Sequence, residues 1–131
     1  MSENFGKLVL RLCLGGLLLF HGINKLLNGL EPIKSALTAH NIPAVLAYGV
    51  YLGELIAPVL IILGLFSRVG GVLVVLNMLI ALTLMHLGQL AALNPNSGGY
   101  ALELQILYLA SGLTVALIGA GRFSVGNSRW N

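Results

Sequence analysis

Four apolar segments dominate the sequence, and each is long enough to cross a lipid bilayer. They run approximately over residues 5–27, 44–66, 69–90 and 100–120. The hydrocarbon core of a bilayer is about 30 Å thick, and a helix needs roughly 20 apolar residues to span it. The chain is 57% hydrophobic and only 8% charged, whereas soluble domains carry about 25% charged residues. We therefore predict an all-α fold, an integral membrane four-helix bundle that residues 1–131 form as a single domain.

The connections between the segments predict a short additional helix and an orientation. The first connection contains EPIKSALTAHNIP, in which Pro32 and the apolar residues after it predict a short interfacial helix that closes before Pro43. Four spans place both termini and the turn between the second and third spans on one side. Basic residues gather on that side: Lys7, Arg11, Arg68, Arg122 and Arg129. The positive-inside rule then predicts that the N- and C-termini are cytoplasmic.

The scattered charges and the single cysteine exclude several classes of function. The seven basic and four acidic residues stand singly, without the basic stripe that follows a phosphate backbone, so we expect no nucleic-acid partner. Cys13 has no second cysteine with which to form a disulfide or a CxxC redox pair, and we interpret it as a small core residue. The first segment contains Arg11 and lacks a small-residue cleavage site, which indicates a retained span rather than a signal peptide.

Several ionisable side chains within the apolar segments fall at one depth. A rise of about 1.5 Å per residue puts five of them at comparable heights in the outer half of the bundle: His21, Lys25, Glu54, His86 and Glu103. A lone charge in hydrocarbon costs at least about 2.5 to 3.5 kcal/mol, so such groups pair or face water. We predict a polar site whose candidate catalytic residues are His21, Lys25, Glu54 and Glu103, with Lys25 paired to Glu54 or Glu103. The candidate substrate-binding residues are Tyr51, His86 and Tyr100.

The other polar and small residues have structural interpretations. We interpret Arg11 as reaching toward cytoplasmic headgroups, and Asn77 as making an interhelical hydrogen bond toward Arg11 or Thr114. Pro58 predicts a kink near Glu54 that frees a backbone carbonyl. Five glycines are expected to mark close contacts between helices: Gly15, Gly16, Gly22, Gly112 and Gly119.

Two histidines and two glutamates at one level also raise the question of a metal or a haem. Carboxylate-bridged metal sites in four-helix bundles use a Glu-x-x-His motif. Here Ala57 and Ile106 stand where that motif needs histidine after Glu54 and Glu103. We therefore expect no metal site, and we rank a metal and a haem ligated by His21 and His86 below a quinone as cofactors.

The order and spacing of several short pieces resemble the DoxX family of small four-span membrane proteins over nearly the whole chain. The pieces are RLCLGGLLLFHGINKL, GELIAPVLIILGLFSR, NMLIALTLMH, GGYALELQILYL and GAGRFSV. The resemblance implies a multi-pass protein of the cell inner (plasma) membrane. Through the thiosulfate:quinone oxidoreductase relatives of the family, and its links to thiol and oxidative-stress systems, it also implies quinone or sulfur redox chemistry.

Two functional hypotheses remain open on the sequence alone. In the first, the outer half of the bundle binds a quinone: His21, Lys25 and Glu54 or Glu103 supply donors and a proton route, and Tyr51 or Tyr100 packs against the ring. The chain shows no dinucleotide loop and no CxxC, so such an oxidoreductase subunit would depend on a redox partner protein for electrons. In the second, the chain is a non-enzymatic membrane scaffold or a small-solute or proton carrier, for which a homo-oligomer would compensate for the lack of an inverted repeat.

Overall fold

The computed structural model describes residues 2–85, 88, 91–127 and 129–131, which fold as a bundle of helices. In chain order the elements are α1 (Ser2–Asn28), α2 (Glu31–Ala39), the 3₁₀ helix η1 (Ala44–Gly49), the π-helix η2 (Leu52–Ile56), α3 (Ala57–Leu63), α4 (Ser67–Met85) and α5 (Glu103–Ile118). In these residues three stretches are long and apolar enough to cross a membrane, Ser2–Asn28, Ala44–Leu63 and Ser67–Leu84, and α5 is a shorter apolar helix. The predicted all-α membrane bundle is confirmed.

The second and third spans are separated by a tight turn. The second span ends at Leu63 rather than near residue 66, because Gly64 adopts a left-handed conformation with φ of 73° that closes the helix. The next helix then begins at Ser67, two residues earlier than the apolar pattern predicts, and its described part ends at Met85. The end predicted for this span, near residue 90, lies outside the described residues.

The fourth span is shorter than the predicted 100–120. Tyr100 pairs with Leu93 in an isolated β-bridge, so the chain before α5 is held as a loop. The helix itself comprises Glu103–Ile118. Gly119, with φ of 77°, turns the chain away after it. At about 1.5 Å per residue, these 16 residues cover only part of the thickness of a bilayer.

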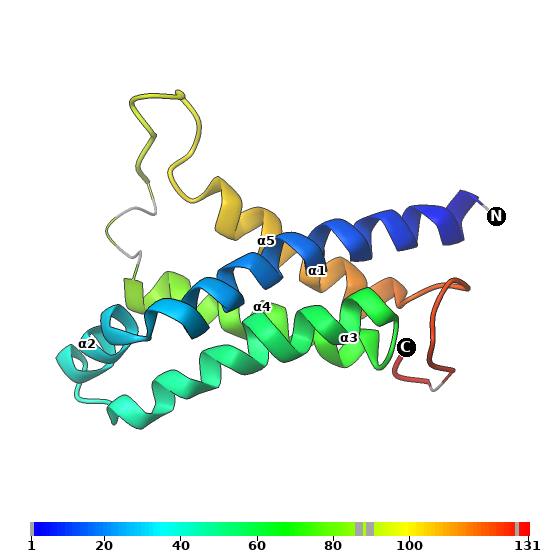
Figure 1. The fold of residues 1–131 in the computed structure, drawn as a ribbon. Helices are drawn as coiled ribbons and strands as arrows, with labels where there is room; N and C mark the ends of the chain where they lie inside the picture. Colours follow the sequence, from blue (N-terminus) through cyan, green and yellow to red (C-terminus); the bar gives the residue numbers. More distant parts are fainter. Residues whose placement is uncertain (1, 86–87, 89–90, 128) are drawn as a thin grey trace.

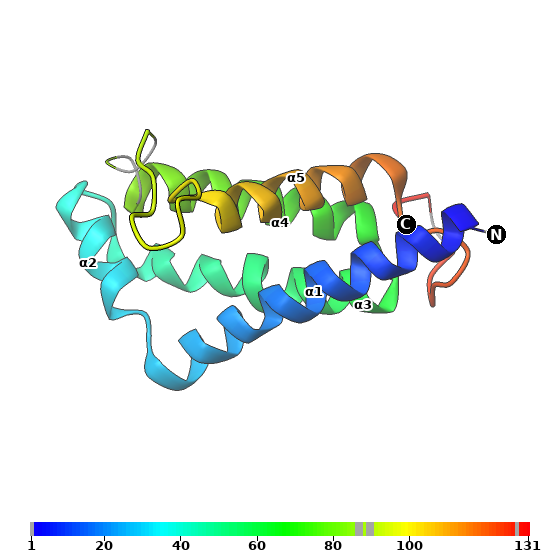
Figure 2. The ribbon, with the colours of Figure 1, turned by 90° about the horizontal axis from the view of Figure 1, so that it is seen from above.

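The helices lie in two layers. Figure 2 shows α4 and α5 side by side in one layer, and α1 beside the segment of η2 and α3 in the other. The layers meet because α3 also packs on α4 and α1 on α5. Both termini lie at one end of the bundle, and α2 lies at the opposite end (Figure 1). Four helical segments that run back and forth along the bundle place both termini at the same end (Figure 1).

All four spans contribute to one apolar core. Its buried residues come in pairs from each helix: Leu14 and Leu18 from α1, Ala57 and Ile61 from α3, Val74 and Met78 from α4, and Tyr108 and Val115 from α5. The outer faces of the same helices are apolar as well, with Phe20 70% and Leu117 68% exposed. Contiguous exposed apolar surface of this kind is typical of a face in contact with lipid.

The helix predicted in the first connection is α2, and it covers one end of the bundle. Pro32 stands in its first turn, and the helix ends at Ala39, before Pro43, as the sequence predicts. Leu37 is buried in a second apolar cluster, formed with η1 and α4. The Lys34 ammonium donates a hydrogen bond to the Tyr48 hydroxyl at 3.2 Å, which ties α2 to η1 and raises the pKa of Lys34.

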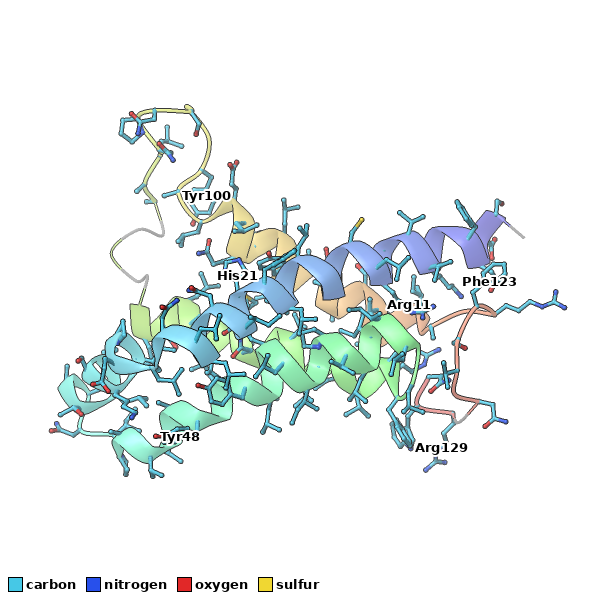
Figure 3. The ribbon with its side chains drawn as sticks, viewed as in Figure 1. Arg11, His21, Tyr48, Tyr100, Phe123 and Arg129 are labelled. Atoms are coloured by element: carbon cyan, nitrogen blue, oxygen red, sulfur yellow. The ribbon has the colours of Figure 1, made fainter. Side chains whose placement is uncertain are left out.

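Arg11 does not reach toward headgroups, and that interpretation is wrong. Its side chain is 1% exposed, and its guanidinium donates to four backbone carbonyls near the termini (Figure 3). Two belong to the last turn of α3, Ile61 at 2.8 Å and Ile62 at 2.9 Å. The others follow α5, Ala120 at 2.9 Å and Phe123 at 2.7 Å. Carbonyls at helix ends lack intrahelical partners. The buried guanidinium of Arg11 therefore supplies hydrogen-bond donors both to the end of α3 and to the segment after α5.

The small residues of α1 divide between the inner and outer faces. Gly15 and Gly22 allow close approach, since a Cβ at either would collide with α3 or η2, and Gly112 does the same between α5 and α4. Gly16 is different, because a Cβ there would meet no described atom within 4 Å. Cys13 is exposed, so its interpretation as a core residue is wrong, as is that of Gly16 as a helix contact.

Candidate functional site

An ion pair joins the first and second spans inside the bundle. The Lys25 ammonium lies 2.6 Å from both carboxylate oxygens of Glu54. The Glu54 side chain is 4% exposed and that of Lys25 is 28% exposed. Between the two carboxylates that the sequence offered to Lys25, the structure selects Glu54. A charge that is costly in an apolar interior is thereby compensated at short range.

A third helix completes the network. The Asn77 side-chain amide, on α4, donates to Glu54 Oε2 at 3.2 Å. The interhelical hydrogen bond predicted for Asn77 is present, but neither predicted partner is correct. Arg11 is occupied at the far end of the bundle, and the Thr114 hydroxyl donates to the Ala110 carbonyl within its own helix at 2.8 Å. Glu54 therefore connects α1, η2 and α4.

The local backbone explains how Glu54 reaches this position. Pro58 lacks an amide hydrogen and cannot donate the hydrogen bond that an α-helix needs at this position. The five residues Leu52–Ile56 form a π-helix that ends two residues before it. The widened turn accords with the predicted irregularity near Pro58. Gly22 of α1 packs directly on the Glu54 backbone carbonyl, and a Cβ there would overlap it. Single π-turns within α-helices occur frequently at functional sites.

The ion pair lies in the wall of a cavity of about 680 Å³. Leucine, isoleucine, valine and alanine make up half of the lining residues. The polar members come from α1, η2, α4 and α5: His21, Asn24, Lys25, Asn28, Glu54, Asn77, Gln105 and Tyr108. Ligand sites typically have volumes of about 300 to 1,000 Å³ with apolar walls and a few convergent polar groups, and this cavity meets that description.

The α1 and α5 side of the cavity carries a second polar group of residues. His21 stands edge-on to the Tyr108 ring, with the centroids 5.7 Å apart, and lies on the side of α1 toward α5 (Figure 3). One turn earlier on α5, Gln105 also lines the cavity. Its Oε1 atom is buried and has no hydrogen-bond partner among the described residues. A buried acceptor without a donor is costly, so a ligand O–H or N–H would stabilise this wall.

The remaining candidate residues lie elsewhere. Glu103 is exposed at the start of α5 and is not among the described residues that line the cavity. Tyr51 packs in the apolar cluster below α2, where its hydroxyl donates weakly to the Lys25 carbonyl at 3.4 Å. Tyr100 lies in the loop before α5 (Figure 3). His86 falls outside the described residues.

Gln105 and Tyr108 were not identified from the sequence as site residues. Both stand on the inner face of α5, together with Gly112 and Val115, at the three-four spacing of one helix face. That spacing was the available signal. Within the part of the chain that the structure describes, no three His, Cys, Asp or Glu side chains lie close enough together to hold a metal ion.

Comparison with known proteins gives one match. The family model described as DoxX matches residues 6–87, which is more than half of the 131 residues. The matched region contains Lys25, Glu54 and Asn77, and so the whole Lys25–Glu54–Asn77 network. No curated protein and no solved structure matches the chain.

Proposed function

Because this chain belongs to the DoxX family, and its resemblance to that family implies quinone chemistry, we propose that it binds the headgroup of a quinone in the cavity beside Lys25 and Glu54. The observation that carries this proposal is a charged network in the wall of a largely apolar cavity of about 680 Å³. An apolar ring with polar atoms at its edge requires this combination of walls. We further propose that the protein acts as a redox subunit of the cell inner membrane.

The donors in the cavity suit a quinone carbonyl. A lysine ammonium has three N–H groups, and Lys25 directs two of them to Glu54, so one is left for a ligand oxygen. Gln105 adds an amide on the opposite helix, and its unpartnered Oε1 can accept from a ligand hydroxyl. His21 and Tyr108 offer an aromatic edge to the ring between these groups. The residues therefore fit the oxidised and the reduced headgroup.

The same residues provide a proton route. When bound, a quinone takes up two electrons and two protons on reduction. Lys25 and Glu54 hold an exchangeable proton at their contact, and Asn24 and Asn28 follow as exposed polar residues on the last turns of α1. Asparagine does not itself carry a proton, so water that solvates Asn24 and Asn28 would deliver it from the end of the bundle to Lys25, without crossing the apolar core. Electrons would come from a redox partner protein of the thiol-oxidising or sulfur-oxidising class.

We propose that this end of the bundle faces the outer side of the membrane. The opposite end carries the termini and most of the basic residues (Figure 1), which favours a cytoplasmic position for both termini. Arg68 at that end donates to the carbonyls of Ala116 and Leu117, at 3.1 and 2.5 Å. Arg122 and Arg129 follow α5 and are exposed.

A second candidate function is a scaffold or a proton or small-solute carrier, alone or as a homo-oligomer. One observation favours it: the Lys25–Glu54–Asn77 network pairs its own charges and so joins three helices without any ligand. Polar contacts of this kind can hold membrane helices together. Under this alternative, substitutions in the network lower stability, and no small molecule is retained.

The test compares the quinone content of proteins purified gently in their native lipid. We expect near-stoichiometric quinone in the wild-type protein, and little in Glu54→Gln or His21→Ala. Glu3→Gln, which makes the same chemical change at an exposed position far from the cavity, is the matched control and should retain the quinone. Thermal unfolding of each variant shows that it is folded. Quinone no higher than in the bulk lipid for the wild-type protein would favour the scaffold or carrier.

A further inference from the structure

The cavity reaches the surface of the protein through walls of different character. Along the last turns of α1 its lining is polar, with Asn24 and Asn28 exposed, whereas α2 contributes the apolar Pro32, Ile33 and Leu37. Between η1 and η2 on one side and α4 on the other, the lining is apolar: Leu46, Gly49, Leu52, Leu76 and Ile80. We call these five residues the apolar rim.

The large side chains of the apolar rim belong to the cavity and to the outer surface at once. On the η1 and η2 side, Leu46 is 60% exposed and Leu52 is 48% exposed. On the α4 side, Leu76 is 50% exposed and Ile80 is 56% exposed. These elements belong to two stretches that are long and apolar enough to span the membrane, so we expect this surface to face lipid chains. The cavity is therefore continuous with the lipid-facing surface at the rim.

Gly49 leaves the rim open. A Cβ built at this position would meet no described atom within 4 Å. One turn further along, the two elements close on each other, because a Cβ at Gly53 would collide with the Asn77 side chain. The gap is thus bounded at one end by the network that holds Glu54.

We propose that the apolar rim is a lateral portal, through which a quinone with a long hydrocarbon tail enters from the bilayer and in which the tail stays while the headgroup reaches Lys25. This inference rests on the proposed function and specifies its ligand as a lipid-resident quinone rather than a water-soluble one. The geometry supports it, because a tail leaving the polar end would meet Asn24 and Asn28 and then water. At the rim the tail meets leucine and isoleucine and then lipid.

If the rim is the portal, a bulky residue placed there should exclude a tailed quinone but not a tailless one. Lipid chains are as apolar as leucine, so moving the tail from lipid into the portal changes the binding free energy little. The affinity of the tailed quinone alone therefore does not test the portal. A plug at the rim, however, should block a tailed quinone while a tailless one still enters from the polar end. The ratio of the two binding constants, measured in the same lipid, isolates the portal.

The experiment uses the full chain in lipid nanodiscs, with a benzoquinone without a tail and the same ring carrying a decyl chain as probes. Each binding constant is expressed in moles of probe per mole of lipid. We expect Gly49→Trp to lower the tailed-to-tailless binding ratio by about tenfold or more. Gly49→Ala should leave the ratio unchanged, since its Cβ has free space. Ile80→Trp plugs the rim from α4. Its control is Leu79→Trp, because Leu79 is also on α4 and 46% exposed but is not among the described residues that line the cavity.

The outcomes separate the portal from the quinone site. If neither probe binds the wild-type protein, the proposed function fails, and the portal fails with it. If both probes bind and both tryptophan plugs leave the ratio as in the wild type, the quinone site stands and the portal is wrong. If Gly49→Trp unfolds in a thermal scan, Ile80→Trp against Leu79→Trp decides alone. An equal loss of ratio in Leu79→Trp would also overturn the portal.

Discussion

At the scale of single residues, Glu54 holds the site together through both its side chain and its backbone. Its carboxylate accepts hydrogen bonds from Lys25 and Asn77, and its carbonyl packs against Gly22. With 3% of its surface exposed, its charge depends almost wholly on these partners. Removing Lys25 would leave a buried carboxylate with one amide for compensation, which is a costly arrangement.

The ion pair can be tested by a double-mutant cycle on stability. Lys25→Met should lower the free energy of unfolding by about 3 kcal/mol, because it leaves Glu54 buried and uncompensated. Adding Glu54→Gln should recover at least about 1 kcal/mol of that loss, since no isolated charge then remains. Denaturant unfolding in detergent micelles measures each corner of the cycle. Additive losses in the double variant would show that the two side chains are not coupled.

The choice between two carboxylates marks the limit of what could be predicted for the site. The rise per residue put Lys25, Glu54 and Glu103 at one depth, and the pairing of Lys25 with a carboxylate is confirmed. Which carboxylate takes part depends on the rotation of α5 about its axis. Hydropathy alone does not fix that rotation, because apolar residues surround the helix. The three-four spacing of Gln105, Tyr108 and Gly112 was the signal for it. The structure turns Glu103 outward and Gln105 inward.

At the scale of helices, the approach of α1 to η2 depends on one position. Gly22 lies against the Glu54 carbonyl, and a Cβ there overlaps backbone atoms rather than a movable side chain. On the same helix Gly16 faces outward, and its Cβ would meet no described atom within 4 Å. The two glycines therefore differ in packing and not in helix propensity.

This difference makes Gly22→Ala and Gly16→Ala a matched pair. Gly22→Ala should lower the free energy of unfolding by about 1–3 kcal/mol, because overpacking forces backbone shifts, and should displace Glu54 from Lys25. Gly16→Ala should raise it by up to about 1 kcal/mol, since alanine favours a helix. Denaturant unfolding checks the stabilities, and quinone content after purification checks the site. Equal effects of the two substitutions would contradict the close contact.

The helices themselves were predictable from the sequence, but the contacts at their ends were not. Length and hydropathy located four spans, because a bilayer sets the length of its helices. Neither property indicates that Arg11 would turn inward and donate to the carbonyls of Ile61 and Ala120. A single arginine near a span end fits snorkelling equally well. The choice depends on where α3 and α5 end, which is set by Gly64 and Gly119.

At the scale of the whole molecule, the two ends of the bundle differ in the residues and elements that they hold. One end holds both termini and the buried Arg11, and the other holds α2, the loop before α5 and the polar side of the cavity (Figures 1 and 2). A quinone site on the outer side would receive protons from the outside. If the orientation were reversed, the same site would exchange protons with the cytoplasm. The topology therefore decides which compartment the site serves.

Cysteine labelling in sealed right-side-out vesicles tests this topology. The background is Cys13→Ser, because Cys13 is exposed. Ser97→Cys, in the loop before α5, should react with a membrane-impermeant maleimide in intact vesicles, since the loop lies at the end opposite the termini. Ser2→Cys should react only after the vesicles are lysed, because the positive-inside rule predicts that the basic terminal end is cytoplasmic. The reverse pattern would keep the fold and invert the orientation. Labelling of both from outside would contradict an even number of crossings.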